Sequence, residues 1–440
     1  MKIDFGNKTV GGFMYEFVRG LSAQNIGAAE FGECMETIGR IKDDDFESWT
    51  AEWTVLADQV SSYAARELAR GDKTSTRRAF LRASNYYRMA VFYVPHTDPR
   101  QKKLWERSRD CFREMVKVSD RPIEYVDFAF GKATLSGYFV SGGEGKRPTL
   151  IALGGFDSTM EEVYGWIGNA AADYGWNCLI FEGPGQWSAL MNNPGLVFQA
   201  DYEKPVGAAV DYLETRSDVD IDKIAIIGYS MGGYLAPRGA LEPRIKACIP
   251  NSLFVDCGAA ARSAMKGLLK NPKIMDAAFN MAMKKSLPAR WNFQHSKWTL
   301  GIQNPHDWVK FYEHFTIKGC ESRYASPMLF LFSEDDIVNA AGPGADIVAD
   351  MLDFILKLGC KRYIRLFTRR EGASSHCQMG GLTYAHASVF QWLNHIFYSK
   401  PIMKNNDPAE GKLFIDLCGK FGGKEAAVKA TKLLEAATLI

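Results

Sequence analysis

The sequence predicts an α/β fold in which a mostly parallel central sheet is flanked by helices. Three observations support this prediction. Short apolar runs alternate with helical patterns over about residues 121–400, the first 120 residues have helical spacing, and a helix-rich interval interrupts the alternation at about residues 252–325. A chain of 440 residues suits one large domain with additions, or two domains.

Residues 1–120 are expected to form a helical domain of their own. Residues 53–94 carry apolar side chains at three- and four-residue spacing, and Gly71 and Asp72 divide the stretch into two helices. The segment 95–100 contains two prolines and an aspartate, which predicts a turn.

A β-hairpin and a series of buried strands are predicted for residues 121–400, the core of the protein. Residues 123–130 and 133–140 alternate apolar and polar side chains around Gly131 and Lys132, which predicts the hairpin. Near-continuous apolar runs then predict strands that are covered on both faces of a parallel sheet. These runs lie at residues 149–153, 177–181, 223–228, 246–251, 327–332 and 362–367.

Two further segments depart from this alternation. Residues 252–325 are rich in Met, Lys, Trp and Phe and have no strand pattern. Because an insertion at the carboxyl end of a strand usually covers the ligand crevice of an α/β sheet, we expect a helical cap here. Residues 401–440 are expected to form a tail with one helix, which packs on the surface or on a partner chain.

The composition argues against several classes of protein. Hydrophobic residues make up 47% and charged residues 24%, and the net charge of +2 gives no reason to expect nucleic acid or an anionic membrane as partner. No apolar run reaches the roughly 18–20 residues that span a bilayer, and the N-terminus lacks a secretory pattern. The nine cysteines form no CxxC pair, which indicates reduced thiols in a cytoplasmic protein. We expect no metal and no cofactor.

A serine between a strand and a helix is the strongest functional signal. The motif GYSMG at residues 228–232 follows a predicted strand and opens a helix of small residues. Such a turn holds the serine in a strained conformation with its hydroxyl exposed, and the flanking glycines leave room for the turn. The pattern predicts that Ser230 is a nucleophile rather than a hydroxyl in a tight turn.

A nucleophilic serine requires a base, and the base requires an orienting acid. In this architecture the acid follows the serine along the chain and the histidine comes last. Asp336, after the run 327–332, is the predicted acid, with Asp335 as the alternative and Glu334 as the third choice. His376, in a Gly- and Ser-rich loop after the last predicted strand, is the predicted base.

Two backbone N–H groups are expected to stabilise the oxyanion. One is that of Met231, at the start of the helix, and the other is that of Phe156 or Gly155, in the loop LGGFDST. The side chains expected to contact the substrate are Tyr229, Asp157 and Trp187, and His295, His306 and His314 of the cap are further candidates.

With these pieces located, the chain resembles a group of α/β-hydrolases. The group includes 2,6-dihydroxypseudooxynicotine hydrolase and the fungal pigment-pathway hydrolases that shorten polyketides. The resemblance covers about residues 10–400 and implies an α/β-hydrolase fold in which the N-terminal helices form a lid over the serine. Trp187 follows GPGQ where a glycine is common, which changes the expected pocket. The matching segments are RASNYYRMAVFY, LGGFDSTMEE, FEGPGQ, GYSMGGYLAPRGA and EGASSHCQ.

The resemblance implies hydrolysis of a carbon–carbon bond beside a carbonyl in some members and of esters in others. We therefore expect a retro-Claisen hydrolase that acts on a bulky aromatic or polyketide-like small molecule in fungal secondary metabolism. An ester hydrolase and an acyltransferase would use the same triad and remain alternatives. An inactive binding protein is a further alternative, against which the ordered triad argues. The oligomeric state is open, and the resemblance suggests a homodimer through the N-terminal helices.

Overall fold

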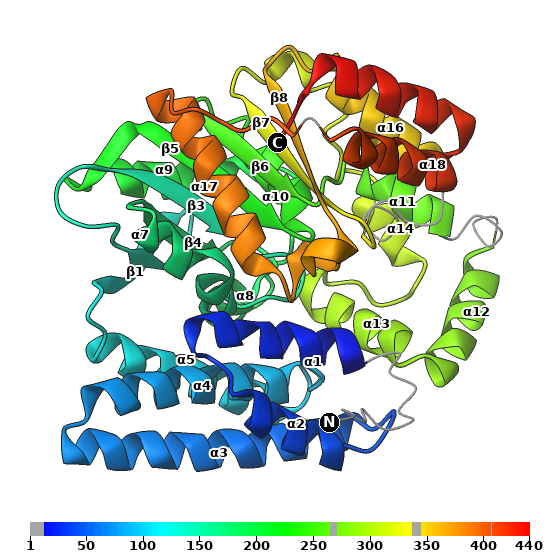
Figure 1. Ribbon diagram of the computed structural model, residues 1–440. Helices are drawn as coiled ribbons and strands as arrows, with labels where there is room; N and C mark the ends of the chain where they lie inside the picture. The colour runs from blue at the N-terminus through cyan, green and yellow to red at the C-terminus, as the bar shows by residue number, and fades with distance from the viewer. Residues whose placement is uncertain (1–12, 265–270, 337–344, 406) are drawn as a thin grey trace.

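The computed structural model describes residues 13–264, 271–336, 345–405 and 407–440 (Figure 1). In this part of the chain a nine-stranded sheet has the order β1-β2-β4-β3-β5-β6-β7-β8-β9. The pairs β1–β2 and β2–β4 are antiparallel, and every other pair is parallel. The predicted mostly parallel sheet is confirmed.

The strands coincide with the predicted apolar runs, with one addition. Every position of β4, β6 and β7 is buried, as expected of strands covered on both faces. The final strand, β9, was not predicted. The bounds are β1 (Ile123–Phe130), β2 (Ala133–Val140), β3 (Arg147–Leu153), β4 (Asn177–Glu182), β5 (Val219–Tyr229), β6 (Ala247–Asn251), β7 (Met328–Ser333), β8 (Arg362–Phe367) and β9 (Thr438–Leu439).

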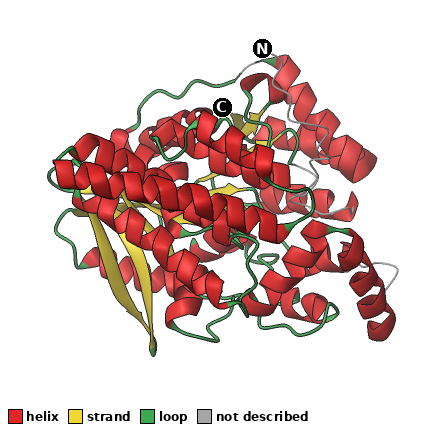
Figure 2. Cartoon of the chain, turned by 90° about the horizontal axis from the view of Figure 1, so that it is seen from below, coloured by secondary structure: helices red, strands yellow, loops and turns green. Residues whose placement is uncertain are grey.

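The N-terminal region is helical, as predicted, and lies below the sheet in Figure 1. Gly71, at φ 80°, ends one helix, and the side chain of Asp72 caps the next by accepting the N–H of Ser75. Seen from below, these helices lie in front of the strands (Figure 2). They are α1 (Phe13–Ser22), the 3-10 helix η1 (Ala23–Ile26), α2 (Phe31–Arg40), α3 (Phe46–Arg70), α4 (Lys73–Val91) and α5 (Pro99–Lys117).

The sheet separates two hydrophobic cores. Alternate side chains of β3 enter different cores: Leu150 and Ala152 pack toward the N-terminal helices, while Ile151 and Leu153 pack on the other side. The flanking elements are α6 (Met160–Val163), the π-helical turn η2 (Tyr164–Gly168), α7 (Asn169–Asp173), α8 (Trp187–Asn192), α9 (Glu203–Glu214), α10 (Gly232–Gly239), α16 (Ala345–Lys357) and α17 (Leu382–Tyr398).

Between β6 and β7 the chain forms helices that reach the N-terminal region. The Trp291 ring stacks on that of Phe92 with centroids 4.6 Å apart, and its indole N–H donates to the Phe92 carbonyl at 2.8 Å. The cap elements are α11 (Cys257–Ala264), α12 (Pro272–Lys285), α13 (Leu287–Thr299), α14 (Asp307–Tyr312) and the 3-10 helix η3 (Glu321–Arg323).

The last residues return to the sheet. Helix α18 (Pro408–Ala436) packs on α16, and β9 then pairs with β8 in parallel. The tail therefore packs on the surface of its own core, and its contact with a partner chain stays a prediction. Two short 3-10 helices, η4 (Arg369–Glu371) and η5 (His376–Gln378), follow β8.

Candidate active site

The predicted nucleophile lies at a strained turn between β5 and α10. Ser230 is half-buried and has a φ of 57°, in the left-handed region that side-chain-bearing residues rarely adopt. The crowding explains the glycines around it. A Cβ on Gly228 would lie 2.0 Å from the carbonyl oxygen of Gly232, and one on Gly233 would lie 1.4 Å from that of Ser252. No larger residue fits at either position.

Asp336 and His376 meet beyond the ends of β7 and β8. The Nδ1 of His376 lies 2.7 Å from the Oδ2 of Asp336, and the hydroxyl of Ser252 donates to the same oxygen at 2.6 Å. Asp336 is only 1% exposed. The alternative acid, Asp335, pairs instead with Arg369 at the surface.

Electrostatics in this pair favour charge on both partners. Burial opposes ionisation of Asp336, but His376 and the Ser252 hydroxyl outweigh it and hold the pKa of the carboxyl below its ordinary value. Burial lowers the pKa of His376, whereas Cys377 and Asp336 raise it, and the net direction is upward. The carboxylate therefore stabilises an imidazolium, the species that forms when His376 accepts a proton.

A paired amide contact joins the serine side of the site to the histidine side. The N–H of Ser230 donates to the carbonyl of Asn251 at 2.7 Å. The Asn251 and Gln378 side chains exchange hydrogen bonds of 2.7 and 3.0 Å, and Gln378 also donates to the Ser333 hydroxyl at 2.8 Å. These bonds link the ends of β5, β6 and β7 to the segment that carries His376. No local pattern in the sequence indicated this contact.

The loop after β3 lies directly against Ser230. A Cβ on Gly155 would lie 2.8 Å from the Cβ of Ser230 and 3.1 Å from the N of Met231. The N–H of Gly155 donates to the Ser158 hydroxyl at 2.9 Å, so it is engaged. Within the described residues, neither the Phe156 N–H nor the Met231 N–H donates a hydrogen bond. Both N–H groups are among the expected oxyanion donors, and that role stays a prediction.

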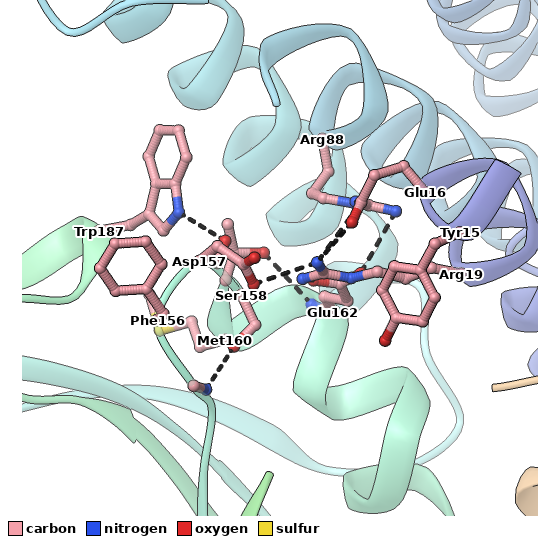
Figure 3. Close-up of polar contacts among 12 residues, drawn as sticks. Tyr15, Glu16, Arg19, Arg88, Phe156, Asp157, Ser158, Met160, Glu162 and Trp187 are labelled. Atoms are coloured by element: carbon pink, nitrogen blue, oxygen red, sulfur yellow. Dashed lines mark hydrogen bonds and ion pairs between the residues drawn. The ribbon is translucent and has the colours of Figure 1, made fainter. Parts of the chain in front are cut away.

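The three residues expected to contact substrate make protein contacts. The Trp187 indole donates to the carbonyl of Asp157 at 2.9 Å, and the Asp157 carboxylate pairs with Arg19 at 3.1 Å (Figure 3). Tyr229 is 1% exposed, and its ring lies 5.3 Å from that of Trp166. Contact of these side chains with substrate stays a prediction.

Arg19 of α1 is the centre of a buried ionic cluster (Figure 3). It donates to both carboxylate oxygens of Glu162 at 2.7 and 2.6 Å, and it pairs with Glu16 at 3.2 Å. Arg88 of α4 pairs with Glu16 at 3.4 Å and with Glu162 at 3.3 Å. Together with Asp157 the cluster holds two guanidinium groups and three carboxyl groups. Burial raises the pKa of Glu16 to about 7. The cluster attaches the N-terminal helices to the loop that carries Phe156.

The three cap histidines differ in position. His295 is buried, and its Nε2 lies 3.0 Å from the carbonyl oxygen of Phe156. Burial lowers the pKa of His295 to about 4, so the ring is neutral at pH 7 and donates its one N–H to that carbonyl. His306 pairs with Asp276 at 2.8 Å, and His314 is exposed. Only His295 contacts the loop beside Ser230.

No group of three or more His, Cys, Asp or Glu side chains among the described residues has the arrangement of a metal site. None of the helices in the described part of the chain combines the length and the apolar character needed to cross a membrane.

Comparison with known proteins identifies relatives along most of the chain. No family model matches. Hydrolase acrC of Aspergillus aculeatus is 30% identical over 419 residues, which cover 88% of this chain and 97% of the relative. The 20-hydroxy-prefusarin hydrolase FUS2 of Gibberella moniliformis is 30% identical over 410 residues, 88% of this chain and 97% of the relative. The crystal structure of 2,6-dihydroxy-pseudo-oxynicotine hydrolase superposes with a TM-score of 0.67 at 20% identity, covering 87% of this chain and 97% of that one.

Proposed function

The chain belongs to the α/β-hydrolase family of these fungal hydrolases and of 2,6-dihydroxypseudooxynicotine hydrolase, and we propose that it is a serine-dependent hydrolase. In this proposal Ser230 is the nucleophile, His376 is the base and Asp336 orients the base. The proposed reaction is cleavage of a carbon–carbon bond beside a carbonyl, in a bulky aromatic or polyketide-like substrate.

One observation carries the proposal. The 2.7 Å contact between His376 Nδ1 and Asp336 Oδ2 fixes the imidazole so that Nε2 is the nitrogen available to accept a proton. Ser230 follows the end of β5, and Asp336 and His376 follow the ends of β7 and β8, so the strained turn lies at the same edge of the parallel sheet as the acid–histidine contact. A histidine that is held by a buried acid, at the same edge of the sheet as such a turn, supplies the parts required for acyl transfer.

The proposed chemistry starts with a proton transfer. His376 takes the proton of the Ser230 hydroxyl as its oxygen attacks the substrate carbonyl, and the Phe156 and Met231 N–H groups stabilise the oxyanion. When the tetrahedral intermediate collapses, the bond to the adjacent carbon breaks and that carbon leaves as an enolate. The enolate then takes the proton from His376. Water, deprotonated by His376, attacks the acyl-enzyme and releases the acid and the free serine.

The surroundings of the loop fit a flat apolar substrate. The His295 ring stacks on Trp291 at 5.2 Å and meets the edge of Phe156 at 4.8 Å. The Trp187 and Trp298 rings lie 4.9 Å apart. Aromatic side chains provide large rigid contact areas for rings, and the resemblance of the motifs supports a polyketide-like compound. An enolate is a good leaving group when a second carbonyl conjugates with it, so a 1,3-diketone is the simplest test substrate.

The test combines labelling with product analysis. A fluorophosphonate probe should label the wild type at Ser230, and Ser230→Ala should abolish both labelling and turnover of a p-nitrophenyl ester. Ser62→Ala, an exposed serine of α3, is the matched control and should behave as the wild type. Mass analysis of products from a 1,3-diketone and from a matched ester separates carbon–carbon cleavage from ester hydrolysis. Full turnover by Ser230→Ala would refute the proposal, and hydrolysis of the ester alone would refute its carbon–carbon part.

A further inference from the structure

Three successive carbonyl groups of the loop beside Ser230 are each held by a side-chain N–H donor. The donors come from two distant parts of the chain, the start of α8 and the cap helix α13. The hydrogen bonds are Gln186 Nε2 to Gly155 at 3.1 Å, His295 Nε2 to Phe156 at 3.0 Å and Trp187 Nε1 to Asp157 at 2.9 Å.

The first of these donors is itself fixed on its other side. Gln186 is 2% exposed, and its Oε1 accepts the Gly183 N–H at 2.9 Å and the Tyr202 hydroxyl at 3.0 Å. Because an amide oxygen accepts and an amide nitrogen donates, these two donors determine which end of the Gln186 amide faces Gly155. The side chain is therefore held in one orientation, with Nε2 directed at the Gly155 carbonyl.

This contact sets the direction of the neighbouring N–H. The carbonyl of Gly155 and the N–H of Phe156 belong to one planar trans peptide, in which they point in opposite directions. A carbonyl that points at Gln186 thus turns the Phe156 N–H to the other side. A Cβ on Gly155 would lie only 2.8 Å from the Cβ of Ser230, so this peptide lies against the nucleophile.

We propose that Gln186 is a positioning residue for the oxyanion hole, because it fixes the peptide whose N–H stabilises the oxyanion. The proposal rests on the proposed function, since it assigns a role in the Ser230 reaction. Gln186 contacts no reacting atom and acts only through the Gly155 carbonyl. A donor that is free to rotate by a few tens of degrees loses much of its value, because preorganisation is what makes an oxyanion hole effective.

Gln186→Met removes the donor and keeps the approximate length of the side chain. We expect kcat for a p-nitrophenyl ester to fall about 10- to 100-fold while KM changes less than about threefold, since the ground-state carbonyl gains little from the hole. Affinity for an aryl trifluoromethyl ketone, which forms a tetrahedral adduct with the serine, should fall by a similar factor. Rates are divided by the concentration of protein whose Ser230 reacts with the fluorophosphonate, so that unfolded protein does not contribute to kcat.

Gln186→Glu tests the hydrogen bond through the pH dependence of activity, which would not change if Gln186 had only a structural role. When protonated, the new carboxyl group can still donate to the Gly155 carbonyl, and when ionised it can only repel it. Burial raises the pKa of a carboxyl, and that of the nearby buried Glu182 is raised to about 7 for this reason. The ratio of Gln186→Glu activity to wild-type activity should therefore fall as the pH rises through the pKa of the new group.

Asn177 of β4 supplies the matched control. Like Gln186, it is a buried amide that accepts a backbone N–H and donates to a backbone carbonyl, but it lies outside the loop beside Ser230. Its Oδ1 accepts the Gly142 N–H at 2.9 Å and its Nδ2 donates to the Asp218 carbonyl at 2.9 Å. Asn177→Leu should lower the melting temperature but leave kcat per titrated serine unchanged within about twofold.

The outcomes separate this inference from the function on which it rests. A wild type that the fluorophosphonate does not label at Ser230 refutes the proposed function. If the wild type is labelled and Gln186→Met keeps kcat and ketone affinity within about threefold, only the role of Gln186 is refuted. The role of Gln186 is also refuted if the ratio of Gln186→Glu activity to wild-type activity does not change with pH. This second measurement tests the role even if Gln186→Met fails to fold.

Discussion

The Nδ1 of His376 lies 2.7 Å from the Oδ2 of Asp336, although the two residues are 40 positions apart. Each follows the end of a strand, and β7 and β8 are parallel neighbours in the sheet. The loops that follow these two strands leave the same edge of the sheet, and this brings the carboxyl group of Asp336 and the imidazole of His376 together.

Asp336→Asn should lower kcat by about 10³- to 10⁴-fold, because an amide in this position favours the wrong tautomer of His376 and cannot stabilise the imidazolium. Asp335→Asn is the matched control at the adjacent position. Asp335 contacts Arg369 and the Ser374 hydroxyl and not His376, so its replacement should change kcat by less than about threefold. Steady-state kinetics with a p-nitrophenyl ester measures both. The assignment of the acid fails if the two variants exchange these results.

The rate should rise with pH through the pKa of His376, because only the neutral imidazole can accept the serine proton. Cys377 and Asp336 more than offset the lowering effect of burial, so this pKa lies above the ordinary value of 6.5. The half-maximal rate of fluorophosphonate labelling is therefore expected at a pH above 6.5. A labelling rate that is already maximal at pH 6 would contradict the raised pKa.

Glu16→Gln should stabilise the protein at alkaline pH. Its pKa is about 7 in the folded protein against 4.5 ordinarily, chiefly because burial disfavours the charge. The folded state therefore binds a proton that the unfolded state releases, and stability is lost as the pH rises from 4.5 to 7. The variant should gain up to about 3 kcal/mol of unfolding free energy at pH 8 and almost none at pH 4.5, in urea titrations.

Glu162→Gln is the comparison within the same cluster. Glu162 accepts two hydrogen bonds from Arg19, at 2.7 and 2.6 Å, so its replacement leaves a buried guanidinium without that partner. This variant should be less stable than the wild type at pH 8 by about 3 kcal/mol. Equal stability of the two variants at pH 8 would contradict the expected difference between replacing Glu16 and replacing Glu162.

Gly233→Ala should prevent correct folding or abolish activity, because the added Cβ would lie 1.4 Å from the carbonyl oxygen of Ser252. Gly39→Ala is the control, because it adds a Cβ at a position where that atom contacts no other atom. No atom lies within 4 Å of a Cβ on Gly39, which is in α2, so alanine should stabilise the helix by about 0.5–1 kcal/mol. Thermal unfolding compares the two. A loss of stability in Gly39→Ala would count against the local argument.

Much of this fold could be predicted from local patterns. Each predicted apolar run forms a strand, because a strand that is buried on both faces needs apolar side chains at nearly every position. The motif at residues 228–232 indicated the strained turn, because glycine is required wherever backbone approaches this closely. The helix break at Gly71 and Asp72 was also predictable, since both residues act through their own backbone or its nearest N–H groups.

The long-range contacts could not be predicted in this way. Gln186 and Gly155 are 31 residues apart, and Arg19 and Glu162 are 143 apart, so nothing local indicates that they meet. Trp187 was predicted to contact the substrate and was noted as a departure from a glycine, but no local pattern indicated that its indole donates to the Asp157 carbonyl. The strand β9 has two residues, too few for any alternation to be recognised.

That short strand has a consequence for how copies of the protein behave together in solution. It lies along β8, and the N–H of Ile440 donates to the carbonyl of Ile364 at 2.9 Å. Without it, β8 would present unpaired backbone groups to other molecules, an arrangement that invites edge-to-edge association. Removal of residues 438–440 should therefore promote aggregation even where the folded core remains intact.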